Sequence, residues 1–400
     1  MSKKLIIIIV ALFAVQISVY VVMHNWEEEE AITKSVYHTT PEGKSLLTKY
    51  PDFETREIVY LNGQDLTELP EEILLFKNLK YLHLENNSFQ YFPYEVLELE
   101  HLEHLFLNNN QISHVNIEPF LNASNSLTTL EINENQLEAI TGLENFPNLT
   151  HLDLSNNGLT ELNVNCPNLT RINLSSNDFR TIPNLTQTQC TFINLARNRI
   201  EALDFGQLPI WVEILEVQSN SIASIIIDAE KFSFSKLSEL DVSNNNLTLF
   251  PNELLKINTL SILKLAQNSI SLWSSEDFPI NENIVKIDLS GNNLIVLLAD
   301  LNTFLPNLQS LLLNNNQLVN VSFNHDNLYV LELQNNDGAV CDLKLPYLNT
   351  LYCDYEHIET EKHTIIANNL KDLRVYNTNG NTLSQKVTNT RYLDVDVSYE

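Results

Sequence analysis

The chain has 400 residues, with 51 acidic and 23 basic side chains and a net charge of −28 at pH 7. This charge argues against nucleic acids and other partners that are bound mainly through phosphates, since such binding needs a basic surface. Hydrophobic residues make up 44% of the sequence, which is enough to build a core and excludes a disordered chain. With only 4 cysteines, a small disulfide-rich scaffold is excluded as well.

The first element in chain order is an apolar segment at the amino terminus. Lys3 and Lys4 precede an apolar run from Leu5 to Val22, and four acidic residues, Glu27 to Glu30, follow it. A basic flank before a run of about 18 apolar residues is typical of a signal peptide or of a membrane anchor. The charge difference across the run favours an orientation with the following chain outside the cytoplasm. We therefore predict a signal peptide or an N-terminal membrane anchor at residues 1–25, and an exported chain that is secreted or attached to a membrane.

Residues 26–55 are expected to cap a repeat array that governs most of the remaining sequence. The segment Leu79–Phe89 has the form L-x-x-L-x-L-x-x-N-x-L, and ten further near-complete copies follow in register, the last at Leu308–Leu318. Degenerate copies begin at Arg56 and recur after Leu328. Corresponding positions are spaced by roughly 22 residues, which is the period of a solenoid.

The leucines of each copy predict a short strand. In Leu82-x-Leu84 the alternation places both leucines inward and His83 outward. One such strand cannot bury its apolar side alone, so neighbouring coils must stack and share one core. We expect about sixteen parallel strands in an arc of roughly 70 Å. Because the spacing between copies varies, the opposite side should be irregular, with short 3₁₀ turns and few long helices.

An asparagine recurs at the turn that follows each predicted strand. Its side-chain amide has two donors and a carbonyl acceptor, which can satisfy backbone groups that the turn leaves without water. We interpret these residues as structural rather than as a binding site. The predicted ladder consists of Asn87, Asn110, Asn135, Asn157, Asn177, Asn198, Asn220, Asn245, Asn268, Asn292, Asn316 and Asn336.

This pattern resembles the leucine-rich repeat superfamily, from about Arg56 to about Val397. The resemblance implies an α/β solenoid, a horseshoe with a parallel concave β-sheet and an irregular convex side with few long helices. Repeats are assigned to residues 56–336, and degenerate C-terminal repeats with a cap to residues 337–400. In style the array is similar to extracellular leucine-rich immune proteins of arthropods and, more distantly, to Toll-type receptor ectodomains. It departs from them in lacking a full set of cap cysteines.

The cysteines divide into two pairs. Cys166 and Cys190 fall at repeat positions that other copies fill with apolar residues, so we expect free thiols in the core. Cys341 and Cys353 lie where the repeat pattern breaks, and export would permit their oxidation, which makes them a candidate disulfide.

No motif for catalysis, phosphate binding or metal binding has the spacing that its chemistry requires. The pair His101 and His104 has no accompanying set of metal ligands. We therefore predict no catalytic residue, no cofactor and no metal.

The outward residue of each predicted strand forms a column on the concave face. Its middle is acidic, which an ordinary solvated surface also explains, whereas both ends are aromatic. Exposed aromatic residues gathered near an arginine are typical of protein interfaces. The candidate ligand-binding residues are Tyr81, His83 and Phe106 near the start and Leu312, Tyr329, Tyr352, Tyr355, Arg374 and Tyr376 near the end.

The sequence thus predicts an extracellular or membrane-tethered recognition module. It would bind a protein, or another macromolecule, through its concave face, and the family resemblance implies a role in innate immunity. A bacterial surface adhesin or an envelope scaffold is the alternative. An enzyme that carries a repeat array would need a catalytic domain, which no segment supplies. The sequence leaves the oligomeric state open.

Overall fold

The computed structural model describes residues 45–119, 126–228, 236–273, 279–297, 300–336, 340–354, 364–367, 369–376 and 382–385. The predicted signal peptide or anchor, most of the predicted N-terminal cap and the end of the degenerate repeats predicted at residues 337–400 lie outside these residues. Within the described part of the chain, no helix has both the length and the apolar character needed to cross a bilayer.

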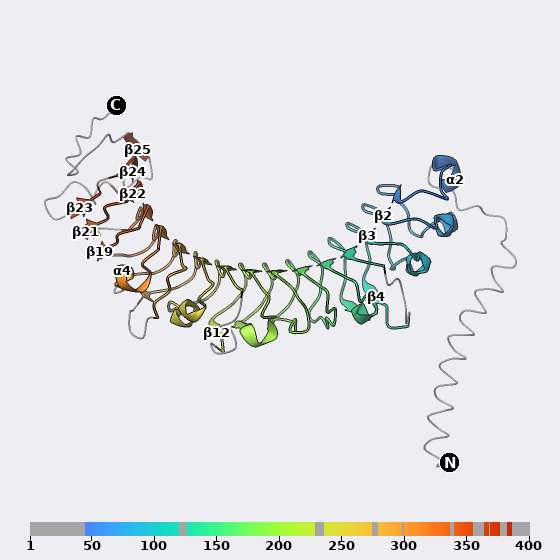
Figure 1. The fold of residues 1–400 in the computed structure, drawn as a ribbon, viewed down its shortest axis with the longest axis horizontal. Coiled ribbons are helices and arrows are strands. Elements are labelled where there is room, and N and C mark those ends of the chain that lie inside the picture. The colour runs from blue at the N-terminus through green and yellow to red at the C-terminus, as the bar shows by residue number, and fades with distance from the viewer. Residues whose placement is uncertain are drawn as a thin grey trace, which may run out of the picture.

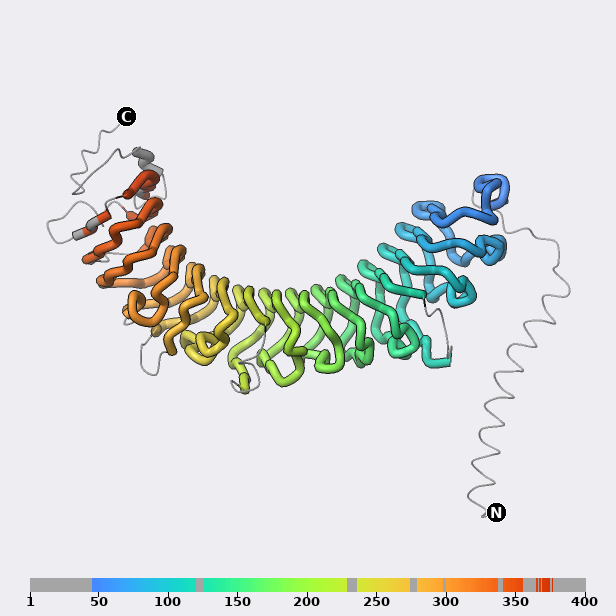
Figure 2. Tube along the Cα trace, in the orientation of Figure 1, coloured from blue at the N-terminus to red at the C-terminus, as the bar shows by residue number. Residues whose placement is uncertain are grey.

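The coils stack into a curved solenoid whose inner side is lined by one 16-stranded sheet (Figures 1 and 2). The predicted horseshoe with a concave parallel sheet is therefore confirmed. In spatial order the strands are β1 (Ile58–Tyr60), β2 (Tyr81–His83), β3 (His104–Phe106), β5 (Thr129–Glu131), β7 (His151–Asp153), β8 (Arg171–Asn173), β9 (Phe192–Asn194), β11 (Ile214–Glu216), β13 (Glu239–Asp241), β14 (Ile262–Lys264), β16 (Lys286–Asp288), β18 (Ser310–Leu312), β20 (Val330–Glu332), β22 (Thr350–Asp354), β24 (Asp372–Tyr376) and β25 (Thr382–Gln385).

The last strand corrects the expected sheet, since β25 pairs with β24 antiparallel while all other neighbours pair parallel. Only the five residues from Asn377 to Asn381 separate the two strands. A parallel pair needs a crossover of a dozen residues or more, whereas an antiparallel pair can be joined by a short connection.

The convex side is irregular, as expected. Its helices are short: α2 (Leu46–Lys49), η1 (Glu71–Leu75), η2 (Tyr94–Glu98), η3 (Leu143–Asn145), η4 (Phe205–Gln207), η5 (Asn252–Lys256) and α4 (Leu301–Phe304), where η marks a 3₁₀ helix. Three smaller sheets, which the sequence did not predict, also lie on this side: β4 (His114–Asn116) with β6 (Ala139–Thr141), β10 (Ala202–Asp204) with β12 (Ser224–Ile226), and the series β15 (Leu272–Trp273), β17 (Val296–Leu297), β19 (Asn320–Asn324), β21 (Val340–Lys344) and β23 (Thr364–Ile366) (Figure 1).

One hydrophobic core runs through the whole array, from Leu46 to Leu373. Leu82 and Leu84 are fully buried, while His83 between them stays partly exposed, as the strand period predicts. At the amino-terminal end, the Tyr50 ring lies edge-on to that of Phe76, with centroids 6.1 Å apart.

Each asparagine of the ladder joins two coils at the corner that follows its strand. The Nδ2 of Asn198 donates to the carbonyls of Leu174 on the preceding coil and Leu195 on its own coil, both at 3.0 Å. Its Oδ1 accepts the backbone N–H of Phe179 at 3.1 Å. The other eleven repeat this arrangement.

The residue before every ladder asparagine has a left-handed backbone conformation, and in all but one coil it is not glycine. Arg197, for example, has φ 56°. Non-glycine residues are uncommon there, although asparagine tolerates this region better than most. Six of these positions are themselves asparagine: Asn86, Asn109, Asn156, Asn244, Asn315 and Asn335. The backbone of the corner therefore accounts for part of the high asparagine content.

Candidate functional site

The concave sheet presents two outward residues per strand, and its register aligns them into two rows. In one row His83 lies beside Phe106, and Phe106 beside Glu131. In the other, Tyr81 lies beside His104, and His104 beside Thr129. These side chains do not build the core, so their chemistry is free to vary from coil to coil.

Five rings gather at the amino-terminal end of this face. We call Tyr60, Tyr81, His83, His104 and Phe106 the ring patch. Their rings stack along the sheet, with centroid distances of 4.6 Å for Tyr60–His83, 4.5 Å for His83–Phe106 and 4.3 Å for Tyr81–His104. The parallel register produces the stacking, because neighbouring strands lie about 4.8 Å apart.

The ring patch also has polar groups. His83 Nδ1 lies 2.9 Å from Glu85 Oε1. The pKa of His104 is lowered, chiefly because partial burial disfavours its charged form. Tyr60 was missed in the sequence because its repeat is degenerate, although it is 50% exposed.

The structure also gathers part of the predicted carboxy-terminal site. The Arg374 guanidinium lies 4.7 Å from the ring centroid of Tyr352. The Tyr352 hydroxyl donates to Asp372 Oδ2 at 3.3 Å, and Arg374 Nη2 lies 3.5 Å from the same oxygen. We call Leu312, Tyr329, Tyr352, Arg374 and Tyr376 the carboxy-terminal patch.

The other members of this patch lie farther along the same face. Leu312 lies two strands before Tyr352, on β18, and Tyr376 ends β24. Tyr329 directly precedes β20 and is 50% exposed. Tyr355, which the sequence also suggested, lies outside the described residues.

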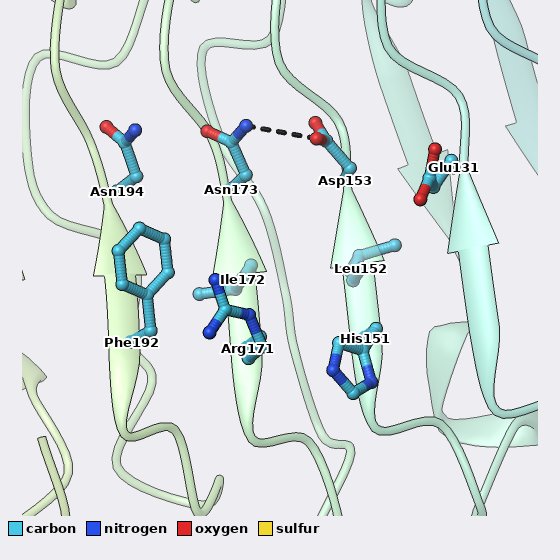
Figure 3. A pocket seen from close by; sticks show the side chains of 9 residues that line it. All are labelled: Glu131, His151, Leu152, Asp153, Arg171, Ile172, Asn173, Phe192 and Asn194. Atoms are coloured by element: carbon cyan, nitrogen blue, oxygen red, sulfur yellow. Dashed lines mark hydrogen bonds between the residues drawn. The ribbon is translucent and has the colours of Figure 1, made fainter.

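Between the two ends, four strands enclose a shallow hollow of ≈ 300 Å³ (Figure 3). We call it the central hollow. Its floor is Leu152 and Ile172, and its two sides are the row His151, Arg171 and Phe192 and the row Glu131, Asp153, Asn173 and Asn194. The sequence indicated Glu131 and Asp153 only as part of an acidic face. It missed the first row, because only one outward position was read in the four strands of the hollow.

The central hollow holds an arginine with no ion pair among the described residues. The Arg171 guanidinium lies 4.5 Å from the ring centroid of Phe192. His151 has a lowered pKa, first because burial disfavours its charge and second because Arg171 is cationic. Its imidazole is therefore neutral at neutral pH.

The acidic part of the face lies beyond the hollow. Lys264 Nζ is 2.6 Å from Glu239 Oε1 and 3.8 Å from Asp241 Oδ2. The pKa of Glu216 is raised, first by burial and then by the negative charge of Asp241. In this region the carboxylates of Glu239 and Asp241 form ion pairs with Lys264, whereas Arg171 in the central hollow has no ion pair among the described residues.

The expected disulfide between Cys341 and Cys353 is not formed in the structure, where both side chains are fully buried. Cys341 lies on β21 of the convex side and Cys353 on β22 of the concave sheet, and each occupies an inward strand position. Burial raises the pKa of the Cys341 thiol to about 12. Cys166 and Cys190 are also free and buried.

In the described part of the chain, no group of three or more histidine, cysteine or acidic side chains could hold a metal ion. The His101–His104 pair has no such partners there.

Comparisons with known proteins agree with this architecture. Residues 100–159 match the family described as Leucine rich repeat, and residues 236–257 match a second Leucine Rich Repeat family. Toll-like receptor 2 of Canis lupus familiaris is 27% identical over 176 residues, which cover 42% of this chain and 19% of the receptor. The match thus spans about a fifth of the length of these curated relatives.

Two solved structures are also similar. A leucine-rich repeat protein of Leptospira interrogans is 27% identical, with a TM-score of 0.63 over 76% of this chain and 79% of its own. The LRIM1/APL1C complex contains a chain that is 24% identical, with a TM-score of 0.56 over 77% of this chain and 54% of its own. The repeat pattern, the horseshoe and these matches together show that the chain belongs to the leucine-rich repeat superfamily.

Proposed function

We propose that this protein is an extracellular or membrane-tethered recognition module that binds a macromolecular partner, in the first place a protein, along its concave sheet. One observation carries the proposal. Aromatic, cationic and acidic side chains gather in three groups, the ring patch, the carboxy-terminal patch and the central hollow, at sheet positions that the fold leaves free. A strip a few residues wide along the arc offers about 1,000 Å² per partner, enough for a standard interface.

The relatives support this function and suggest its setting. The similarity to Toll-like receptor 2 supports an extracellular location and a role in innate immunity. The LRIM1/APL1C structure is a complex by its title, which supports a protein partner. The apolar segment at residues 1–25 is consistent with export or with a membrane anchor.

A bacterial surface adhesin or envelope scaffold is the second candidate, favoured by the similarity to the Leptospira protein over most of both chains. Enzymatic removal of N-linked glycans from the native protein separates the two settings. A shift in electrophoretic mobility would exclude the bacterial candidate. Unchanged mobility, together with recovery in a bacterial envelope fraction, would support it.

The concave site is tested by affinity capture with the full chain, followed by binding measurements on the double variant Tyr352→Ala/Arg374→Ala. We expect at least about tenfold weaker binding, because aromatic residues and arginines dominate interface energies. The thermal unfolding profile should hardly change, because a cation–aromatic contact at a solvent-exposed position contributes little to stability.

The matched control is Trp211→Ala/Lys236→Ala. This pair also stacks a cation on an aromatic ring, at 5.1 Å, but lies outside the 16-stranded sheet. It should bind like the unaltered chain. Equal affinities of the two double variants would contradict the assignment of the carboxy-terminal patch.

A further inference from the structure

The hydrogen-bond acceptors of the central hollow are mostly occupied by the protein itself. Asp153 Oδ1 accepts the backbone N–H of Ser155 at 2.9 Å and its hydroxyl at 2.6 Å, and Asp153 Oδ2 accepts from Asn173 Nδ2 at 3.0 Å (Figure 3). The side-chain carbonyl of Asn173 accepts from Ser175. That of Asn194 accepts the N–H of Ala196 at 2.9 Å.

The donors that remain have no acceptor among the described residues. They are the guanidinium of Arg171, held over the Phe192 ring, and the Nδ2 of Asn194. One acceptor stays open across the hollow, because Asn108 occupies only the Oε2 oxygen of Glu131. The neutral imidazole of His151 contacts Thr150 through Nδ1, which leaves Nε2 available. A ligand therefore has to accept from Arg171 and Asn194 and donate to Glu131.

Charge narrows the ligand class. Asp153 and Glu131 line the same space as Arg171, so a full charge of either sign meets a like charge there. The chain as a whole carries −28, which repels anions over longer distances. Hydroxyl groups both donate and accept without charge. The hollow is also large enough for a ligand, since pockets for small molecules begin at about 300 Å³.

We infer that the central hollow binds a neutral saccharide unit, carried by a glycan of the partner or by a free oligosaccharide. This inference rests on the proposed function, since it gives the concave face a defined subsite. Arg171 and Asn194 donate to hydroxyl oxygens of the sugar, and Glu131 accepts from one hydroxyl. The stacked Arg171 and Phe192 form a flat wall for its C–H groups.

The experiment measures binding of the full chain to an array of neutral oligosaccharides, with acidic peptides as a second set of probes. The test variants are Arg171→Ala and Asn194→Asp. The second keeps the turn, because Asp153, Asp241 and Asp288 occupy the same column and accept the same N–H two residues later. It replaces only the open donor with an acceptor.

We expect at least one neutral glycan to bind, and both variants to bind it at least tenfold more weakly. The control is Arg180→Ala, which also removes one cation. Arg180 is exposed and lies outside the concave sheet, 3.6 Å from Glu201, so this variant should stay within twofold of the unaltered chain. Loss of partner capture after enzymatic deglycosylation of the partner would identify a glycan carried by the partner protein. Unchanged capture, together with binding to the glycan array, would identify a free oligosaccharide as the ligand.

Three results would overturn the saccharide assignment: no neutral glycan bound, glycan binding that survives both substitutions, or binding to acidic peptides alone. These outcomes differ from failure of the proposed function. Suppose that Tyr352→Ala/Arg374→Ala no longer binds the partner, that Arg171→Ala still binds it, and that no glycan binds. The concave binding site would then be supported and the saccharide subsite would be rejected.

Discussion

Two regions of every coil behave in opposite ways: the corner after the strand and the outward face of the strand itself. At the corner the same residue recurs twelve times and makes the same bonds each time, as Asn87 and Asn336 do at the two ends of the ladder. On the outward face, four residues before that corner in the same coil, the side chain changes from His83 to Phe106 to Glu131. At the corner, buried backbone N–H and carbonyl groups need hydrogen-bond partners within the protein, whereas the outward face is exposed to solvent. Repetition therefore marks residues that build the fold, and variation marks the surface available for recognition.

The largest expected effect breaks the corner. Asn198→Ala leaves the carbonyls of Leu174 and Leu195 and the N–H of Phe179 without their partner. We expect the free energy of unfolding to fall by about 3 kcal/mol or more, because each buried unsatisfied group costs about 1–3 kcal/mol. Urea unfolding measures the loss. Glu201→Ala, on an exposed side chain nearby, serves as the control and should stay within about 0.5 kcal/mol. Similar losses in both variants would contradict the role of the ladder.

A second test concerns the buried thiols. Burial raises the pKa of Cys166 to about 12 and that of Cys190 to about 11, so neither forms the reactive thiolate at neutral pH. We expect thiol-specific reagents to modify the four cysteines at least about 100-fold more slowly in the native chain than after unfolding. Recovery of only two thiols from the unfolded, unreduced chain would instead reveal a disulfide.

The third test compares two different residues, a histidine and an asparagine, that fill the same interior position in different coils. His325 is fully buried, its Nε2 lies 3.0 Å from the Leu305 carbonyl oxygen, and its Nδ1 accepts the N–H of Asn327. Burial lowers its pKa below the ordinary value of 6.5, so the unfolded chain binds the proton more readily than the folded one. Stability from this residue is present above pH 6.5 and falls as the pH drops below that value.

Asn281 fills the equivalent position of another coil and makes comparable bonds, with its Nδ2 donating to Leu255 and Ile257 and its Oδ1 accepting from Asn283. His325→Asn should therefore fold and lose part of the decline in stability between pH 7 and pH 5. Urea titrations of both chains at pH 7 and pH 5 measure this decline in the free energy of unfolding. An unchanged decline would show that other groups dominate.

The smallest effect is expected on the outward face. Phe106→Asn places there the residue that β8 and β9 already have in this row, at Asn173 and Asn194. The close stacking on His83, at 4.5 Å, and the more distant stacking on His104, at 6.4 Å, are lost, so the free energy of unfolding should fall by less than about 1.5 kcal/mol. A loss as large as that of Asn198→Ala would remove the distinction between the two regions.

The fold was predictable because its physical cause repeats. Alternating leucines set the strands, and the asparagine after them marked twelve of the corners. The convex sheets were not predictable, because strands such as β19 follow no fixed residue of the repeat. The antiparallel β25 depends on a short connection that breaks the period, and the last coils are where that period is weakest.

The candidate site was predictable only in part. Reading one outward position per strand found His83, Phe106, Tyr352 and Arg374, whose neighbours in the sheet follow from the register. Reading both positions would have added His151, Arg171 and Phe192. Which donors and acceptors stay open in the hollow depends on bonds such as that from Asn173 to Asp153, and no spacing in the sequence shows these.

The most direct test of concave recognition is site-specific photo-cross-linking of the captured partner. A photoreactive phenylalanine analogue at Phe106 or Tyr352 would lie on the concave sheet, and at the exposed convex residue Ile226 on β12 it would lie on the opposite side. Our account predicts covalent adducts from the first two positions and none from the third. Adducts from Ile226 alone would place the partner on the convex side and contradict it.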